Sequence, residues 1–272
     1  MRITTKALLR RTAAFPRFRA PDPSVGLGAA GLFAGFLVWE LLGHTLDWIA
    51  LPPVSAVARR LVELTLSGQI IGSLGGSLLN LAIALPIALG LGAMVGIIMG
   101  LSRTASAALD PYVNALMTAP SLVFAPIFFS IWGLGRGPIV VLIVTYAIFV
   151  MIVNTQAAVR AVDRDLLEMA HSFSATRAQL LLFVTVPAAA PLMFAGIRVA
   201  VSRSVRGMIN AEMFIALIGL GSLLVESQRK LDASGVYAVL AVIVGVSLLL
   251  IHVVDRVDRR LTSWLPSASR GG

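Results

Sequence analysis

Residues 78–101 of the 272-residue chain are LLNLAIALPIALGLGAMVGIIMGL, an apolar run without a charged side chain. A bilayer core of about 30 Å requires about 20 apolar residues per helix. Residues 139–153 form a second such run, and the whole chain is 58% hydrophobic and only 13% charged. Soluble chains are closer to half apolar and a quarter charged. The sequence therefore predicts an all-α integral membrane protein.

The apolar runs predict six spans, at residues 25–44, 78–101, 111–133, 138–158, 188–210 and 236–254. A cleaved signal peptide is the alternative for the first run. The basic leader is longer than usual, and no clear cleavage site precedes Glu40, so we favour an uncleaved helix. Three prolines lie inside two of the runs and are expected to kink or break them, most of all in the third run: Pro86, Pro120 and Pro126. Glycines at four-residue spacing predict close helix approach: Gly31, Gly35, Gly92, Gly96 and Gly100.

The placement of basic residues predicts that both termini are cytoplasmic. With six spans the termini share a side, and that side then holds fourteen basic residues outside the spans against five on the other, as the positive-inside rule requires. The inner set is Arg2, Lys6, Arg10, Arg11, Arg17, Arg19, Arg103, Arg160, Arg164, Arg177, Arg256, Arg259, Arg260 and Arg270; the outer set is Arg59, Arg60, Arg136, Arg229 and Lys230. The net charge of +9 thus reflects topology, and we expect no nucleic-acid partner.

The chain divides into four expected parts. A basic segment (1–24) precedes the first span and an outer amphipathic helix (25–77), the main core follows (78–256), and a cytoplasmic tail ends the chain (257–272). In the amphipathic helix Val54, Val57, Leu61 and Leu64 share one face. We expect this face to rest at the lipid interface, with docking of a partner as the alternative.

Motifs for catalysis, nucleotide binding and metal binding are absent from the sequence. No Gly-Lys pair occurs, so no phosphate-binding P-loop can form, and the chain cannot hydrolyse ATP by that motif. Cysteine is absent, and His44, His171 and His252 lack ligand spacing. We therefore expect a chain that is not an enzyme and binds neither metal nor cofactor.

Residues 160–187, RAVDRDLLEMAHSFSATRAQLLLFVTVP, form the longest polar segment on the inner side. Asp165 precedes Glu168 by three residues, and Thr176 precedes Gln179 likewise, so each pair fits a capping box. The spacing predicts two short helices with a turn at residues 173–175. Connections are usually shorter than this, which favours a docking surface over a simple connector.

Within this segment, Glu168-Met169-Ala170, Ser174 and residues 184–187 (VTVP) resemble the EAA loop of ATP-binding-cassette (ABC) importer permeases. Other stretches, among them LPPVSAVARRLVEL and AEMFIALIGLGSLL, resemble the sulfonate, nitrate and taurine branch of that family, and the likeness covers nearly everything after residue 50. Two positions depart from the motif. Met169 replaces an alanine, and Ser174 replaces a glycine, whose positive φ would cost serine about 1 kcal/mol.

The resemblance implies a type I importer permease core in the cell inner membrane. Its implied partners are a second permease chain, expected to be an identical copy, two cytoplasmic ATPases that carry ATP and Mg²⁺, and an external substrate-binding protein. The first loop helix would be the coupling helix, and Pro187 would begin the next membrane helix. The resemblance assigns contact with the ATPase to Asp165, Leu167, Glu168, Met169, Ala170, Phe173, Ser174, Thr176 and Arg177.

The fifth span supplies candidates for the substrate pathway. Arg203, Arg206 and Asn210 share a helix face, with Glu212 just beyond. An arginine at the bilayer centre costs about 2.5–3.5 kcal/mol on insertion scales, so it requires water, a partner or a substrate. We expect a small anion as cargo, such as a sulfonate, taurine, nitrate or an organic carboxylate. The alternatives are that the arginines pair with Glu212, Glu40 or carbonyls of neighbouring helices, or that the span is shifted so that they reach an interface.

Two other functions compete with an ATP-driven permease subunit. A secondary transporter or channel would commonly show inverted repeats and mid-membrane carboxylates, and no internal repeat is visible. A membrane scaffold or sensor would need no long docking loop. The sequence therefore favours the permease subunit.

Overall fold

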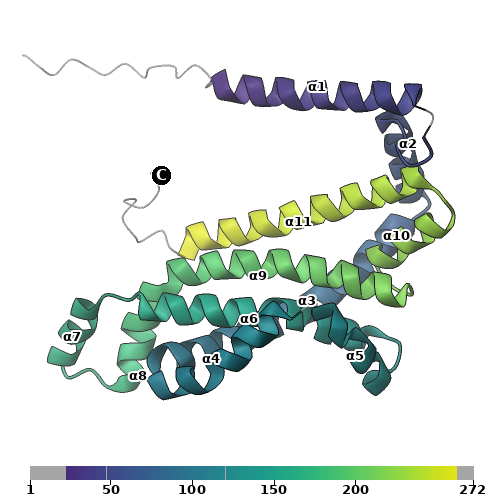
Figure 1. Ribbon diagram of the computed structural model, residues 1–272. Coiled ribbons are helices and arrows are strands. Elements are labelled where there is room, and N and C mark those ends of the chain that lie inside the picture. Colours follow the sequence, from purple (N-terminus) through teal and green to yellow (C-terminus); the bar gives the residue numbers. More distant parts are fainter. Residues whose placement is uncertain (1–22, 47, 120, 262–272) are drawn as a thin grey trace, which may run out of the picture. The chain divides into compact units, whose positions relative to one another are not determined.

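The computed structural model describes residues 23–46, 48–119 and 121–261. The basic leader and the end of the tail, including Arg270, lie outside this part. The described residues are largely helical and contain no strand (Figure 1). The elements are α1 (Pro23–Thr45), α2 (Val54–Leu66), α3 (Gln69–Leu101), α4 (Arg103–Thr118), η1 (Ser121–Phe124), α5 (Ala125–Trp132), α6 (Arg136–Arg160), α7 (Arg164–Ser172), α8 (Arg177–Gln179), η2 (Leu180–Thr185), α9 (Val186–Ile215), α10 (Leu220–Arg229) and α11 (Ala233–Leu261).

The predicted count of six spans is not confirmed. Four helical segments of the described chain are long and apolar enough to cross a membrane: Gln69–Leu101, Arg136–Arg160, Arg177–Ile215 and Ala233–Arg260. The third predicted span is bent, because α4 and the η1–α5 segment meet at 92°; counted as one, they make a fifth span. Pro120, one of the prolines expected to break it, lies outside the described residues. The first predicted span forms α1 but is not among the four.

The chain divides into two units, residues 1–55 and 56–272. In the first unit, the end of α1 is held to the segment that follows it. The indole of Trp39 donates to the carbonyl of Pro52 at 3.0 Å, and the backbone N–H of Ser55 donates to Glu40 at 3.0 Å. No atom lies within 4 Å of a Cβ built on Gly31 or Gly35, so the close approach predicted there is not seen within this chain.

The second unit is built on α6, which packs between α3 and α9 (Figure 1). The predicted glycine stripe of α3 makes this contact. A Cβ on Gly96 would stand 2.6 Å from the carbonyl oxygen of Ile152, and one on Gly100 would stand 2.7 Å from the side chain of Val159. Pro86 does not end α3, which continues from Gln69 to Leu101. Small residues thus let the α3 and α6 backbones approach closely.

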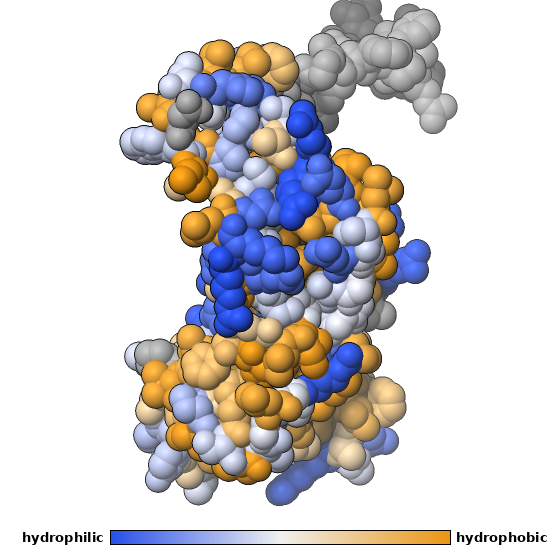
Figure 2. All heavy atoms as spheres, turned by 90° about the vertical axis from the view of Figure 1, so that its right-hand side faces the viewer, coloured by the Kyte–Doolittle hydropathy of each residue, from blue (hydrophilic) through white to orange (hydrophobic). Residues whose placement is uncertain are grey.

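Large hydrophobic side chains are exposed along the spans. On α3, Ile87, Leu91, Met94 and Ile98 recur at helical spacing and are each more than two-fifths exposed. On the face shown in Figure 2, broad hydrophobic patches lie beside a cluster of hydrophilic side chains. Monomeric soluble proteins rarely expose contiguous apolar surface of this kind, and lipid accounts for it.

Helix α2 is the predicted amphipathic helix. Its apolar face was predicted to rest at the lipid interface, but part of this face is buried within the protein. Val57 and Leu64 are buried. Arg60 reaches Asp232, between α10 and α11, at 2.7 Å, and Glu63 at 2.9 Å. These two carboxylates hold the pKa of Arg60 above its ordinary value. Helix α2, most of which belongs to the second unit, is therefore fastened to the turn between α10 and α11.

Residues 177–215 form one continuous helix, which corrects the prediction of a separate second loop helix. Pro187 lies in the first turn of α9, but the longer helical run already begins at Arg177. Ahead of it, η2 is a π-turn in which the N–H of Val186 bonds to Leu181, five residues back. Proline has no N–H and its ring clashes with the carbonyl four residues before it, so the wider π-turn lets the helix pass Pro187.

Candidate functional site: the α7 elbow and the polar residues of α9

The N-cap of α7 lies two residues earlier in the sequence than predicted. Asp163 is the N-cap, and its carboxylate accepts the N–H of Asp165 at 3.0 Å. The predicted capping box of Asp165 and Glu168 is therefore wrong; Asp165 lies in the first turn, where a negative charge suits the helix dipole. The second capping box is confirmed: Thr176 N donates to Gln179 Oε1 at 2.8 Å, and Gln179 N donates to Thr176 Oγ1 at 3.3 Å.

The turn after α7 has the backbone that the glycine of the motif would favour. Ser174 has φ of +57°. Its N–H donates to the carbonyl oxygen of His171 at 2.9 Å, and the N–H of Ala175 donates to the carbonyl oxygen of Ala170 at 3.2 Å. These two bonds form a Schellman motif, which ends a helix through a left-handed residue. The serine thus keeps the turn of the resembled loop despite its Cβ.

The surface of α7 is open. None of its residues is buried, and Leu166, Met169 and Phe173, at helical spacing, are 40%, 55% and 80% exposed. Glu168 is exposed, and its carboxylate makes no hydrogen bond to any described residue. In Figure 1, α7 lies beyond the ends of α6 and α9. We call α7 and the turn at residues 173–176 the elbow. The elbow therefore presents an acidic and apolar surface outside the bundle.

Leu167 differs from the other residues predicted to contact the ATPase. It is half-buried and packs against a cluster formed by Ala158, Val159, Val162 and Ala189. Its side chain anchors α7 to the ends of α6 and α9. The structure therefore places Leu167 behind the exposed face of the elbow.

The polar residues of α9 divide into two groups. Arg203 is half-buried and Arg206 is exposed, and neither guanidinium has an ion pair or hydrogen bond within the described chain. Asn210 donates to the hydroxyl of Tyr146 on α6 at 3.0 Å. Glu40 bonds instead to Ser55 and His44. Within the second unit, the arginines therefore do not pair with Glu212, whose carboxylate has other partners.

Glu212 is fully buried and does not join the arginines. At about 100° per residue, it faces the opposite side of α9 from Arg203. Its carboxylate accepts from Ser77 at 2.8 Å, from Asn80 at 3.1 Å and from the N–H of Gly221 at 3.1 Å. Ser77 in turn accepts the N–H of Leu220 at 2.8 Å. This network fastens the α9–α10 turn to α3.

Sequence reasoning missed the links between α9 and α11. Arg198, counted only as part of the fifth span, pairs with Asp255 at 2.6 Å and with Asp258 at 3.7 Å. The signal in the sequence was that a basic residue in one apolar run could pair with acidic residues at the end of another.

Among the described residues, no group of three or more histidines or carboxylates could hold a metal ion.

Comparison with known proteins decides the class. A family model described as "binding-protein-dependent transport system inner membrane component" matches residues 88–264. The chain belongs to this family. It is a multi-pass membrane permease of an ATP-driven ABC importer, a transport subunit and not an enzyme. Partners of the family are an ATPase and a substrate-binding protein. The alternatives of an ATP-independent transporter and of a scaffold are thereby set aside.

Relatives of the permease agree on the class and differ in cargo. It is 28% identical to a probable ABC transporter permease protein of Brucella melitensis, over 88% of this chain and 97% of the relative. It is 28% identical to the riboflavin transport system permease protein of Chloroflexus aurantiacus, over 60% of each. It is also 28% identical to a putative aliphatic sulfonates transport permease protein of Bacillus subtilis, over 84% and 83%. The predicted sulfonate-type resemblance is therefore confirmed, and family membership leaves the cargo open.

Proposed function

We propose that two copies of this permease form a translocation pathway for a small anion, driven by two ATPases that dock on the α7 elbow. The ATPases carry ATP and Mg²⁺, and an external binding protein delivers the cargo. Both termini and the elbow lie in the cytoplasm. The basic residues Arg103, Arg160, Arg164 and Arg177 lie at or next to the elbow, which supports this orientation.

The observation that carries this proposal is the open face of α7. Leu166, Met169 and Phe173 expose apolar surface on a helix outside the bundle. Such a helix, which also carries the exposed Glu168, is suited to a groove on another protein. Asp165, Ala170, Ser174 and Thr176 shape or border the same face, and we assign the contact to these residues with Leu167 as its anchor.

The helix that follows the elbow gives a route for the work of ATP hydrolysis. Thr176 caps a helix that continues without interruption from Arg177 to Ile215. That helix carries Arg203, Arg206 and Asn210. A displacement of α7 by the ATPase is passed through the turn at residues 173–176 to the helix that carries the polar residues of α9.

The two unpaired arginines support an anionic cargo. A guanidinium keeps its proton and can donate two hydrogen bonds to neighbouring oxygens of a sulfonate or carboxylate. Arg203 and Arg206 have no anionic partner in the described chain, so an anion in the pathway would supply one. We assign the pathway to Arg203, Arg206 and Asn210, and we assign Glu212 to the turn.

The test is uptake by proteoliposomes that contain the permease, its ATPase and its binding protein, with each component omitted in turn. We expect ATP-driven accumulation of the cargo only with all three. Accumulation at the full rate without the ATPase would overturn the proposal.

Glu168→Lys tests the docking surface itself. Reversing this charge should lower uptake and the amount of ATPase that co-purifies. Glu226→Lys is the matched control, since Glu226 is an exposed acid on α10, away from the elbow. Equal uptake and co-purification in the two variants would remove Glu168 from the docking site.

A further inference from the structure

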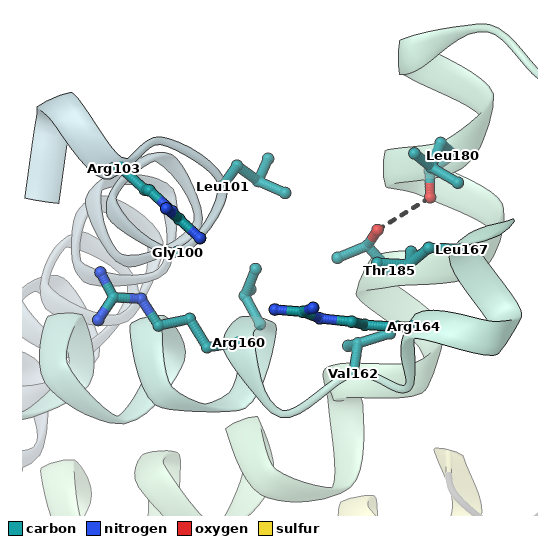
Figure 3. Close-up of a pocket in the computed structure, with 10 residues that line it drawn as sticks. Gly100, Leu101, Arg103, Arg160, Val162, Arg164, Leu167, Leu180 and Thr185 are labelled. Carbon is teal, nitrogen blue, oxygen red and sulfur yellow. Dashed lines mark hydrogen bonds between the residues drawn. The ribbon is translucent and has the colours of Figure 1, made fainter. Parts of the chain in front are cut away.

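A cavity of about 600 Å³ lies beside the elbow, between the α3–α4 corner, the end of α6 and the start of α7 (Figure 3). Three arginines line it: Arg103, Arg160 and Arg164. No carboxylate is among its lining residues, which include the apolar side chains of Leu101 and Leu167. The cavity is therefore strongly basic, with an apolar wall.

The three arginines differ in whether they have hydrogen-bond partners within the protein. Figure 3 shows Arg103 extending from the α3–α4 corner and Arg164 from the start of α7, both toward the space between these elements. Neither has an ion pair or hydrogen bond within the described chain. The guanidinium of Arg160 bonds to Ser106 at 2.5 Å and reaches the carbonyl of Met99 at 3.5 Å. The hydroxyl of Ser106 also donates to the carboxylate of Asp110. This carboxylate offsets part of the charge of Arg160, but it does not do so for Arg103 or Arg164.

The position of the cavity favours a ligand at the membrane surface. It lies where two spans end, α3 at Leu101 and α6 at Arg160. With 25 residues, α6 is about 37 Å long at about 1.5 Å per residue, which exceeds a hydrocarbon core of about 30 Å, and its last turn carries Arg160. Leu101, on the wall of the cavity, is 56% exposed. A lipid could place its headgroup among the arginines and its chains along α3.

We propose that this cavity binds the phosphate group of an anionic lipid headgroup. Unpaired guanidinium groups donate charge-assisted hydrogen bonds to phosphate oxygens, and basic pockets between membrane helices suit anionic headgroups. A free phosphate ion has the same chemistry and is the second source to be distinguished. The site goes beyond the proposed function, because it requires neither the ATPase nor the cargo.

A bound headgroup would link the elbow to the bundle. Leu167 of α7 and Thr185 of η2 line the cavity opposite Arg103. A phosphate held by Arg103 and Arg164 joins the α3–α4 corner to the first residue of α7. Anionic lipid would therefore hold the elbow in place and raise the rate of ATP-driven uptake.

The experiment uses the intact importer in nanodiscs of phosphatidylcholine, with or without phosphatidylglycerol, and counts retained lipids by native mass spectrometry. We expect the wild-type complex to retain phosphatidylglycerol, and Arg103→Gln and Arg164→Gln each to bind it about fivefold more weakly. Arg103→Lys should restore most of the binding, because lysine also binds phosphate as a point charge. Arg259→Gln, an exposed arginine on α11, is the control and should retain the lipid.

A second arm replaces the anionic lipid by inorganic phosphate in phosphatidylcholine discs. Phosphate binding that depends on Arg103 and Arg164, without retention of phosphatidylglycerol, would keep the phosphate site and exclude lipid as its source. Equal lipid retention by Arg103→Gln, Arg164→Gln and wild type, with no phosphate binding, would overturn the proposal. Lipid binding by the permease alone that is lost in the importer would also overturn it and would point to an acidic group of the ATPase.

Discussion

The hydroxyl of Ser77 in α3 donates a 2.8 Å hydrogen bond to the buried carboxylate of Glu212 in α9, across 135 residues of sequence. Asn80 and the N–H of Gly221 donate to the same carboxylate. The acid therefore joins three elements with neutral donors rather than with an arginine. This arrangement explains why an ionisable residue lies at the end of an apolar span.

Replacing Glu212 with alanine should lower the thermal stability of the importer. Three buried donors would lose their acceptor, at about 1–3 kcal/mol for each group left unsatisfied. Glu226→Ala is the control, because its exposed pair with Lys230 contributes little. The apparent Tm of the purified complex and the uptake per folded complex are the measurements. An unchanged Tm, or a Tm loss no larger than in Glu226→Ala, would contradict the structural role.

The glycine stripe gives a sharper packing test. Gly96→Ala should destabilise the complex by about 1–3 kcal/mol, because its Cβ would overlap the carbonyl of Ile152 and the side chain of Thr155. Gly90→Ala, on the same helix, is the control: nothing lies within 4 Å of its Cβ. We expect a lower apparent Tm only for the first variant. Similar Tm values for both would mean that α3 and α6 are less closely packed.

Ser174→Gly should stabilise the elbow. A glycine accepts the positive φ that costs serine about 1 kcal/mol, so the amides of Ser174 and Ala175 should exchange hydrogen about fivefold more slowly. Ser172→Gly, in the last turn of α7, should speed exchange because glycine weakens a helix. Hydrogen exchange followed by mass spectrometry measures both. Faster exchange in Ser174→Gly would show that the serine side chain supports the turn.

Much of this structure follows from local sequence. The four-residue spacing of Gly92, Gly96 and Gly100 predicted the α3 contact, and Thr176 with Gln179 predicted a real capping box. The N-cap of α7 was missed because Asp163 and Asp165 are equally suitable acids two residues apart. The choice between them depends on where α6 ends.

Other features depend on long-range contacts. Pro187 suggested a helix start, but the π-turn that carries the helix past it has no sequence signature. The burial of Glu212 requires Ser77 and Asn80 from a distant helix. The basic cavity exists only because folding brings Arg103 beside Arg164, 61 positions later in the sequence. Sequence periodicity carries no information about such pairs.

Arg203→Gln and Arg206→Gln should each lower uptake of the cognate anion by about tenfold or more, because each removes a charge-assisted hydrogen bond. Arg259→Gln, exposed on α11, should transport normally. Uptake is compared in complexes whose assembly and basal ATPase activity are intact. Normal uptake by both well-assembled variants, or a neutral or cationic cargo, would exclude this role.

The central claim is that the ATPase docks on the exposed face of α7, and the absence of cysteine allows a direct test. Met169→Cys and, as control, Glu226→Cys are labelled with a water-soluble maleimide in the permease alone and in the assembled importer. We predict that the ATPase slows labelling of Met169→Cys by about tenfold, because interface side chains are shielded from solvent, and leaves Glu226→Cys unchanged. Equally fast labelling of Met169→Cys with and without the ATPase would contradict the claim.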